Sequence, residues 1–324
     1  MPKSKTGVLL VNLGTPNSPS VPDVRKYLKE FLMDRRVIDI DYWKRSLLVK
    51  GIIVPFRGPK SAKEYQKLWT EEGSPLMYHS VALKKKVQEA LGDTYQVELA
   101  MRYQTPSIPK ALETFKNQGF EKIIVLPLFP QYASATTGSV LEKVQEIIKE
   151  WEVIPQIDYI SKYPNHPKFI QAFGELGTKH LEKEKYDHIL FSFHGLPERQ
   201  IKKASQGNQC KLGDCCDSYH ANNAFCYRAQ CFETARKIAS YLNLDKTQYS
   251  VAFQSRLGRD PWIQPYLDNA IEDLTKKGTK KLLVYSPAFV ADCLETTIEI
   301  GEEYKEQFEE QGGEKLQLVE SLNT

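Results

Sequence analysis

The sequence lacks any apolar run long enough to cross a membrane. The best candidate, LLVKGIIVPF at residues 47–56, is short and is interrupted by Lys50. The opening stretch, MPKSKTGVLLVNLG, passes from a short apolar run directly into a strand pattern. We therefore expect no signal peptide and a cytoplasmic location.

A strong charge of either sign is also missing. The formal net charge of the 324 residues is only +3, which argues against nucleic acid as the main partner. No G-x-G-x-x-G or P-loop pattern occurs, so a nucleotide site is not expected. The length fits one large or two ordinary domains.

Cysteine is almost absent outside one segment. Five of the six cysteines fall within CKLGDCCDSYHANNAFCYRAQC, residues 210–231. In a cytosolic protein such thiols are more often ligands than disulfides. Four thiolates suit Zn²⁺ or an iron–sulfur cluster, and the lack of C-x2-C pairs favours [2Fe–2S] over zinc. Cys231 lies in an amphipathic helical stretch, where packing alone would explain it.

Continuous apolar runs alternate with amphipathic helical stretches. Such runs are typical of parallel strands covered on both faces. We predict strands in residues 6–14, 95–103, 121–130, 188–195, 249–255 and 280–289, with a weaker one in 151–160. Helical patterns include residues 80–92 and 261–278.

The two halves of the chain resemble each other. LLVNLGTP (9–16) matches ILFSFHGLP (189–197), and residues 100–130 match residues 252–289 in their order of strand, turn and helix. We expect an α/β fold of two similar Rossmann-like domains, with parallel sheets flanked by helices and a ligand cleft between them. The expected boundaries are residues 1–160, residues 161–305 with a cysteine-rich insertion at 200–231, and a segment 306–324 that returns to the first domain.

His194 stands at the end of a predicted strand and is followed by Gly195 and Pro197. A lone strand histidine is usually a buried, hydrogen-bonded one. Here the strand end would expose the ring to the cleft, so we favour a functional imidazole that accepts a proton or binds a metal.

An acidic stretch, SPAFVADCLETTIEIGEE, follows the last strong strand at residues 286–303. Helical spacing puts Glu295, Glu299 and Glu302 or Glu303 on one face. A solvated face is the simpler reading, especially for the last two. Aligned like charges destabilise a helix, which hints that they serve a cation.

Two further stretches offer groups for an anion. LFPQYASATTGS (128–139) joins a strand end to a helix start, where ordinary capping by Ser134 or Thr136 is the simpler alternative. Arg102 stands at another strand end and could pair with a carboxylate, although a surface arginine is equally compatible.

Eight landmarks, among them LLVNLGTP, MRYQTPS, FSFHGLP, FQSRLGRDPW and SPAFVADCLETTIEI, make the chain similar to the ferrochelatases, from residue 7 to about residue 322. The resemblance implies an enzyme, a lyase that inserts Fe²⁺ into protoporphyrin IX with release of two protons. It assigns His194 and Glu295 to catalysis and to Fe²⁺, and Glu299 and Glu303 to a metal or proton path. The porphyrin contacts that we expect are Leu13, Arg102, Tyr103, Tyr132, Ser134, Thr136, Phe289 and Asp292.

The resemblance also bears on the branch of the family and on the cysteines. Leu13, where others carry tyrosine, is similar to the protoporphyrin-using branch. The cysteine-rich segment resembles an insertion that holds [2Fe–2S] in some bacterial members, with Cys210, Cys215, Cys216 and Cys226 as the implied ligands.

Alternatives remain at this stage. They are a chelatase for coproporphyrin or for cobalt, and a non-catalytic iron or redox sensor built on the cysteines. Residues 34–63 carry eight Lys/Arg against three Asp among aromatic and aliphatic residues. We expect this segment to make weak peripheral contact with anionic lipid at the inner face of the membrane.

Overall fold

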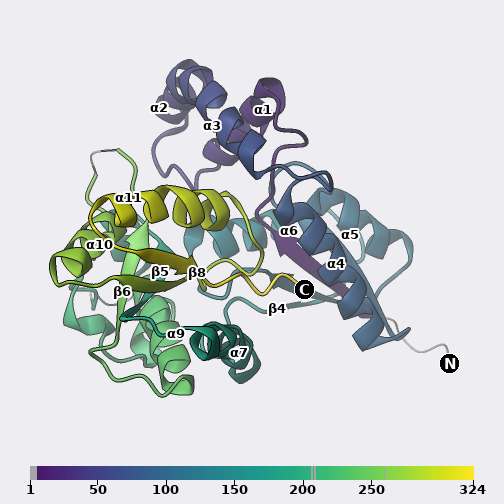
Figure 1. The fold of residues 1–324 in the computed structure, drawn as a ribbon. Helices are drawn as coiled ribbons and strands as arrows, with labels where there is room; N and C mark the ends of the chain where they lie inside the picture. The colour runs from purple at the N-terminus through teal and green to yellow at the C-terminus, as the bar shows by residue number, and fades with distance from the viewer. Residues whose placement is uncertain (1–5, 206, 208, 259) are drawn as a thin grey trace. The chain divides into compact units, whose positions relative to one another are not determined.

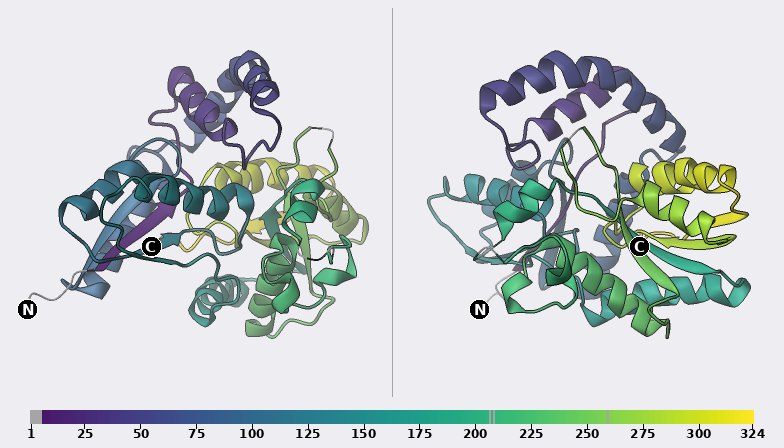
Figure 2. Two further views of the ribbon diagram at one scale, coloured as in Figure 1. Left: turned by 180° about the vertical axis from the view of Figure 1, so that it is seen from behind. Right: turned by 90° about the vertical axis from the view of Figure 1, so that its left-hand side faces the viewer.

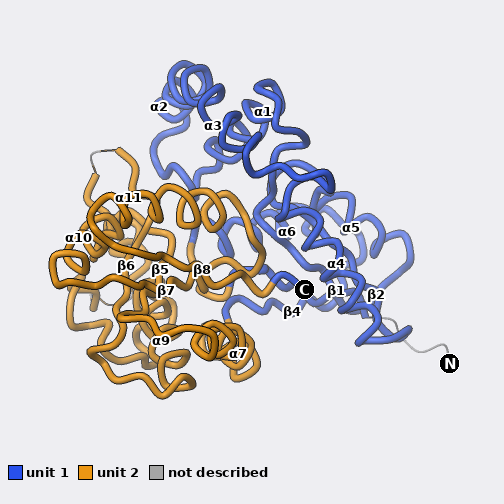
Figure 3. The backbone as a smooth tube through the Cα atoms, in the orientation of Figure 1, with its two compact units in different colours: residues 1–129, 134–162, 323–324 blue, residues 130–133, 163–322 orange. Residues whose placement is uncertain are grey.

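The computed structural model describes residues 6–205, 207, 209–258 and 260–324. Residues 206 and 208 of the expected insertion lie outside the described residues. The chain divides into two compact units, which Figure 3 shows in different colours. The first comprises residues 1–129, 134–162 and 323–324, and the second comprises residues 130–133 and 163–322.

The first unit is built on a parallel sheet of four strands in the order β2-β1-β3-β4. The central strand β1 is buried over most of its length, as its continuous apolar run predicts. The strands are β1 (Thr6–Asn12), β2 (Tyr95–Met101), β3 (Lys122–Pro127) and β4 (Gln156–Tyr159).

The second unit repeats this topology, with the strand order β6-β5-β7-β8 and all neighbours parallel. The strands are β5 (His188–His194), β6 (Tyr249–Gln254), β7 (Lys281–Tyr285) and β8 (Lys315–Leu318). The predicted α/β fold with two similar parallel sheets is confirmed, and so are all seven predicted strands.

The expectation for residues 306–324 was wrong for most of that segment. β8 pairs with β7 and packs Leu316 into the core of the second unit, so the chain stays there through Leu322. Only residues 323–324 group with the first unit.

Helices cover both faces of each sheet. In the first unit α5 and α6 pack on one apolar face, and α1 and α3 lie side by side, as both views of Figure 2 show. Its helices are α1 (Val21–Leu32), α2 (Tyr42–Ser46), the π-helix η1 (Leu47–Ile53), α3 (Val54–Leu68), α4 (Pro75–Leu91), α5 (Ile108–Asn117), the π-helix η2 (Ser134–Gly138) and α6 (Ser139–Ile148).

In the second unit α7 and α9 cover one face of the sheet, and α10, α11 and η6 cover the other (Figure 1). Its helices are α7 (Pro167–Lys183), α8 (Glu198–Ala204), the short 3₁₀ turns η4 (Asp214–Cys216) and η5 (Ala221–Asn223), α9 (Tyr227–Tyr241), α10 (Leu267–Lys276), the π-helix η6 (Leu294–Tyr304) and α11 (Lys305–Glu310).

The repeat extends to fine detail at the carboxyl ends of the strands. Gln104 follows β2 with φ +70°, and Ser255 follows β6 with φ +65°, a left-handed conformation that is uncommon outside glycine. After the third strand of each unit a π-helix begins, η2 in the first and η6 in the second. Such helices are rare and are frequently found at functional sites, and ligands of open α/β sheets bind at the carboxyl ends of strands, so these strand ends are the candidate site.

Candidate active site

His194 is the last residue of β5, and its ring is only partly buried. Its Nδ1 lies 2.6 Å from the carbonyl oxygen of Gly195. A carbonyl oxygen can only accept a hydrogen bond, so Nδ1 must carry the proton. The lone pair of the neutral ring is then on Nε2, where it can accept a proton or bind a metal ion.

A buried amide joins this strand end to the acidic helix. Gln254 ends β6, directly beside His194 in the sheet, and is only 1% exposed. Its Oε1 accepts from Ser192 Oγ at 2.7 Å. Its Nε2 donates to the backbone oxygen of Glu295 at 2.9 Å and to Glu299 Oε2 at 3.2 Å. The Glu299 carboxylate and the backbone of Glu295 are therefore fixed relative to the end of β5.

Glu299 is the carboxylate most affected by its surroundings. Ser255 Oγ donates to Glu299 Oε2 at 2.6 Å, an arrangement that the left-handed backbone of Ser255 allows. Burial raises the pKa of Glu299, and the negative charge of Glu295 adds to the increase, whereas Ser255 and His194 oppose it. His194, Glu295 and Glu299 thus interact electrostatically within one unit.

The raised pKa of Glu299 predicts a pH-dependent gain in stability for Glu299→Gln. The folded state holds the Glu299 proton more tightly than the unfolded chain, so wild-type stability falls as pH rises through this window. The variant should match the wild type below pH 4 and melt at a higher temperature near pH 8, by thermal unfolding at both values. Exposed Glu303→Gln is the control and should change neither melting temperature. A Glu299→Gln gain that is equal at both pH values would contradict this.

The π-helix changes the geometry that α-helical spacing predicts. A π-helix takes more residues per turn, so side chains four positions apart stay closer to one line than in an α-helix. Glu295 and Glu299 are partly buried, and Glu303 is exposed. The row of Glu295, Glu299 and Glu303 therefore leads from the interior toward solvent.

Asp292 has a structural role that its sequence position did not reveal. Its Oδ1 accepts from Thr296 Oγ1 at 3.2 Å and from the backbone N of Ser321 at 3.2 Å, which ties the start of η6 to the end of the chain. The neighbouring Cys293 thiol is buried and hydrogen-bonded to Glu295, and burial raises the pKa of the thiol well above its usual range. Phe289, a short distance before this turn, is partly buried.

The four cysteines singled out from the sequence come together in the second unit. The Sγ atoms of Cys215 and Cys216 are 4.0 Å apart, Cys216 is hydrogen-bonded to Cys226, and Cys210 is hydrogen-bonded to Cys215. Cys210, Cys215 and Cys226 line a small hollow of about 50 Å³. Cys231 is fully buried in the core.

The thiols differ in their readiness to ionise. The pKa of Cys226 is lowered, first by the hydrogen bond from Cys216 and then by backbone N–H groups at the start of α9. The same hydrogen bond raises the pKa of Cys216. Because thiolates are the metal-binding form, Cys226 is the first ligand available. Among the residues described, no three His, Cys, Asp or Glu side chains are arranged around a single metal-ion position.

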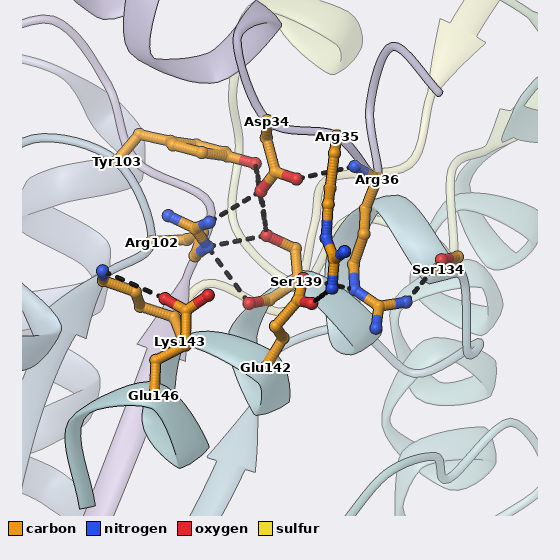
Figure 4. Close-up of polar contacts among 10 residues, drawn as sticks. All are labelled: Asp34, Arg35, Arg36, Arg102, Tyr103, Ser134, Ser139, Glu142, Lys143 and Glu146. Atoms are coloured by element: carbon orange, nitrogen blue, oxygen red, sulfur yellow. Dashed lines mark hydrogen bonds and ion pairs between the residues drawn. The ribbon is translucent and has the colours of Figure 1, made fainter. Parts of the chain in front are cut away.

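A buried carboxylate organises the strand end of the first unit (Figure 4). Asp34 is 9% exposed. Its Oδ2 accepts from Arg102 Nη2 at 2.7 Å, from the Tyr103 hydroxyl at 2.9 Å and from Ser139 Oγ, and its Oδ1 accepts from Arg36 N at 2.7 Å. Four donors on one carboxylate make this a rigid polar core.

Two residues expected to contact porphyrin belong to this network. Tyr103 is fully buried in the apolar cluster of the first unit and its hydroxyl holds Asp34. The guanidinium of Arg102 is paired with Asp34 and Ser139. The porphyrin contacts of both residues stay predictions. The burial of Asp34, which organises both side chains, is not visible in the sequence.

Near the same helix start, Arg36 was not singled out from the sequence. Its Nη1 donates to Ser134 Oγ at 2.9 Å and its Nε to Glu142 at 2.7 Å (Figure 4). Arg35 also pairs with Glu142. Ser134 and Thr136 remain partly buried within η2, and Leu13 packs beside the apolar cluster of α1 and α3.

Comparison with known proteins agrees with the sequence landmarks. The sequence model of the Ferrochelatase family matches residues 5–324. The chain belongs to the ferrochelatase family. The ferrochelatase of Legionella pneumophila strain Philadelphia 1 is 47% identical over 319 residues, covering 98% of this chain and 95% of the relative. That of Coxiella burnetii strain Dugway is 48% identical over 327 residues, covering 99% and 90%.

A solved structure, SirB from Bacillus subtilis with Fe³⁺, shares the fold at a TM-score of 0.55 and 10% identity, covering 98% of this chain and 88% of that one. With its family established, the chain is a porphyrin metallochelatase, a lyase that inserts iron into porphyrin in haem biosynthesis. Fe²⁺ is its substrate. Among the described residues no helix is long and apolar enough to span a membrane.

Sequence reasoning missed Gln254, Ser255 and Ser192. A signal for Gln254 was available, since it ends the strand next to His194 and the carboxyl ends of parallel strands meet at one edge of the sheet. The bond of Ser255 to Glu299 depends on the left-handed backbone conformation of Ser255, which no sequence pattern predicts.

Proposed function

We propose that this chain inserts Fe²⁺ into protoporphyrin IX and that His194 and Glu295 perform the chemistry. The observation that supports this most directly is the group formed by His194, Glu295 and Glu299 at one end of the second sheet, held by Gln254. A free-base porphyrin must lose two inner protons as the metal enters, and it needs a base and a compensating negative charge nearby.

The imidazole suits the role of base or first metal contact. Its Nδ1 is held by the Gly195 carbonyl, and its Nε2 lone pair is available. Glu295 and Glu299 supply negative charge that attracts Fe²⁺, and the raised pKa of Glu299 suits a group that receives a proton and releases it toward Glu303. Phe289, Tyr132, Leu13, Ser134 and Thr136 remain candidates for porphyrin contact, whereas Asp292 already has two partners within the protein.

The insertion assay tests this proposal. Purified protein is mixed with Fe²⁺ and protoporphyrin under anaerobic conditions, and the porphyrin absorption spectrum is followed. Parallel reactions contain coproporphyrin, or Co²⁺ in place of iron. The proposal requires protoporphyrin with Fe²⁺ to be the best pair. A clear preference for coproporphyrin or for cobalt would assign the chain to a different chelatase, and no insertion with any pair would favour a sensor.

We further propose that Cys210, Cys215, Cys216 and Cys226 hold a [2Fe–2S] cluster. What supports this is the donor chemistry: Cys210, Cys215 and Cys226 line one hollow, and Cys216 is hydrogen-bonded to Cys226. In the described part of the chain, the four thiols are not arranged around one metal-ion position. When bound, such a cluster would supply a one-electron redox centre, and Zn²⁺ is the alternative occupant.

Cys216→Ser should lose the visible charge-transfer absorption expected of the purified protein, because one of four ligands is removed. Absorption spectra together with analysis of iron, sulfide and zinc check this. Cys293→Ser, which changes a buried cysteine outside the segment, should keep the colour. If the purified wild-type protein were colourless and contained one zinc ion per chain, the [2Fe–2S] assignment would be wrong and Zn²⁺ would be the occupant.

The segment of α2, η1 and the start of α3 supports weak membrane contact. It exposes large apolar side chains, with Trp43 at 81%, Phe56 at 79% and Leu47 at 73%. Lys50 and Arg57 are exposed in the same segment. Apolar side chains among cations match the surface of an anionic bilayer.

We expect the protein to float with anionic liposomes at low salt and to dissociate at high salt. The double variant Trp43→Ser/Phe56→Ser should lose this binding. Val153→Ser removes an equally exposed apolar side chain elsewhere, at 82%, and should bind as the wild type does. Absence of wild-type flotation at low salt would refute the proposal.

A further inference from the structure

The first turn of α9 connects the cysteine segment to His194. Cys226 is the residue that caps α9, and Tyr227 is its first residue. The Tyr227 hydroxyl donates to the backbone oxygen of His194 at 2.9 Å. Cys226, one of the four clustered cysteines, is therefore the direct sequence neighbour of a residue whose side chain bonds to His194.

The Tyr227 contact is well defined. The Tyr227 ring is buried, and its hydroxyl is also hydrogen-bonded to the Cys231 thiol. Burial raises the pKa of Tyr227 well above its usual range, so the hydroxyl stays protonated and remains a donor at neutral pH.

The bond acts on the peptide unit between His194 and Gly195. The His194 oxygen of that unit is held by Tyr227, and its amide, Gly195 N, donates to Gln254 O at 2.8 Å. A side chain at Gly195 would meet that same Gln254 oxygen at 2.9 Å, so the peptide is held between two elements. The Gly195 oxygen that accepts the Nδ1–H of His194 belongs to the next peptide unit, which shares the Gly195 Cα. The held peptide therefore fixes the backbone between the imidazole and its acceptor.

On its other side the helix is attached to the cysteine segment. Arg236 Nη1 donates to the Cys216 oxygen at 3.2 Å, and Arg228 Nη1 to the Gly213 oxygen at 3.2 Å. Cys226 N donates to Asn223 O at 2.8 Å, and Asn223 Nδ2 to Cys215 O at 3.0 Å. The segment that carries the four cysteines is therefore attached to α9 by direct hydrogen bonds.

The same turn also touches Tyr132. Phe225 packs edge-on against Tyr132 at 5.3 Å between ring centroids, and Gln230 Oε1 accepts from Tyr132 N at 2.9 Å. The residues on either side of Cys226 thus contact two positions that the proposed function assigns to the reaction.

We propose that Tyr227 is a positioning residue for His194 and that it transmits the state of the thiol group to the imidazole. The proposal rests on the proposed function, in which His194 acts on iron or protons and the four thiols bind a cofactor. It adds that the two sites are coupled through one hydrogen bond.

The first test removes only the hydroxyl. Tyr227→Phe should lower kcat for iron insertion by roughly 3- to 10-fold, the usual effect of one lost hydrogen bond, with the KM for porphyrin unchanged. Tyr241→Phe, in the exposed last turn of the same helix, is the matched control and should behave as the wild type does. A Tyr227→Phe variant with wild-type kcat would overturn the positioning role.

The second test measures coupling without an activity readout. Protein labelled with ¹³C at histidine carbonyls, with its thiols reduced and free of cluster, is titrated with Cd²⁺, and the His194 resonance is assigned by its loss in His194→Asn. Cd²⁺ should bind the thiols, seen in ultraviolet absorption, and shift this resonance in the wild type but not in Tyr227→Phe. An unshifted wild-type resonance, or no Cd²⁺ binding, would overturn the coupling. A wild-type protein that carries neither iron nor sulfide would refute the cluster but leave this test valid.

Discussion

His194→Ala is expected to lose iron insertion by roughly 10²- to 10⁴-fold, the range that a positioned acid–base group contributes. The variant lacks the Nε2 lone pair, while the backbone bonds of residue 194 to Tyr227 and of Gly195 to Gln254 remain. The backbone of Glu295 is held by Gln254 and the carboxylate of Glu299 by Ser255, and both bonds remain in the variant. Initial rates with Fe²⁺ and protoporphyrin measure the effect.

His188→Ala is the matched control for this experiment. His188 begins the same strand and bonds to Ser250 at 2.9 Å, far along β5 from the active end. It should retain most of the activity. Circular dichroism and melting temperature of both variants would show that the fold is intact. Normal turnover in a folded His194→Ala protein would contradict the assignment of the site.

Asp34→Asn should lower the free energy of unfolding by about 3 kcal/mol, because it leaves the charge of Arg102 buried without its counterion. The side chains of Asp34 and Arg102 are 4% and 15% exposed, so water replaces little of the lost interaction. Against a total stability of about 5–15 kcal/mol this is a large fraction. Urea unfolding at neutral pH measures it.

Asp41→Asn provides the comparison in the same region of the chain. Its ion pair with Lys44 is 3.2 Å long and both side chains are more than three-quarters exposed, so the change should be within about 0.5 kcal/mol. Equal effects for the two variants would mean that Asp34 is not the anchor that its four donors indicate.

Much of the fold was predictable because parallel strands carry continuous apolar runs. β8 was missed, since KLQL at residues 315–318 is short and half polar. The π-helical form of η6 was also missed, because an acidic row at spacing four is read as an α-helix when only periodicity is available.

Site residues were predictable where the residues that act together are also neighbours in the sequence. His194 before Gly195 and the clustered cysteines are such cases. The bonds of Arg102 and Tyr103 to Asp34 were not predictable, because Asp34 lies almost 70 residues away and is buried by tertiary packing. Gln254 depends likewise on Glu295 and Glu299, which only the folded sheet brings within reach.

The matching orders β2-β1-β3-β4 and β6-β5-β7-β8 mean that one architecture carries two different sets of side chains at corresponding strand ends. In the first unit Leu13 follows β1, and Arg102 pairs with Asp34. In the second unit β5 ends at His194, and the helix that follows β7 carries Glu295 and Glu299. Groups suited to a divalent cation can therefore be placed on this architecture by side-chain changes alone.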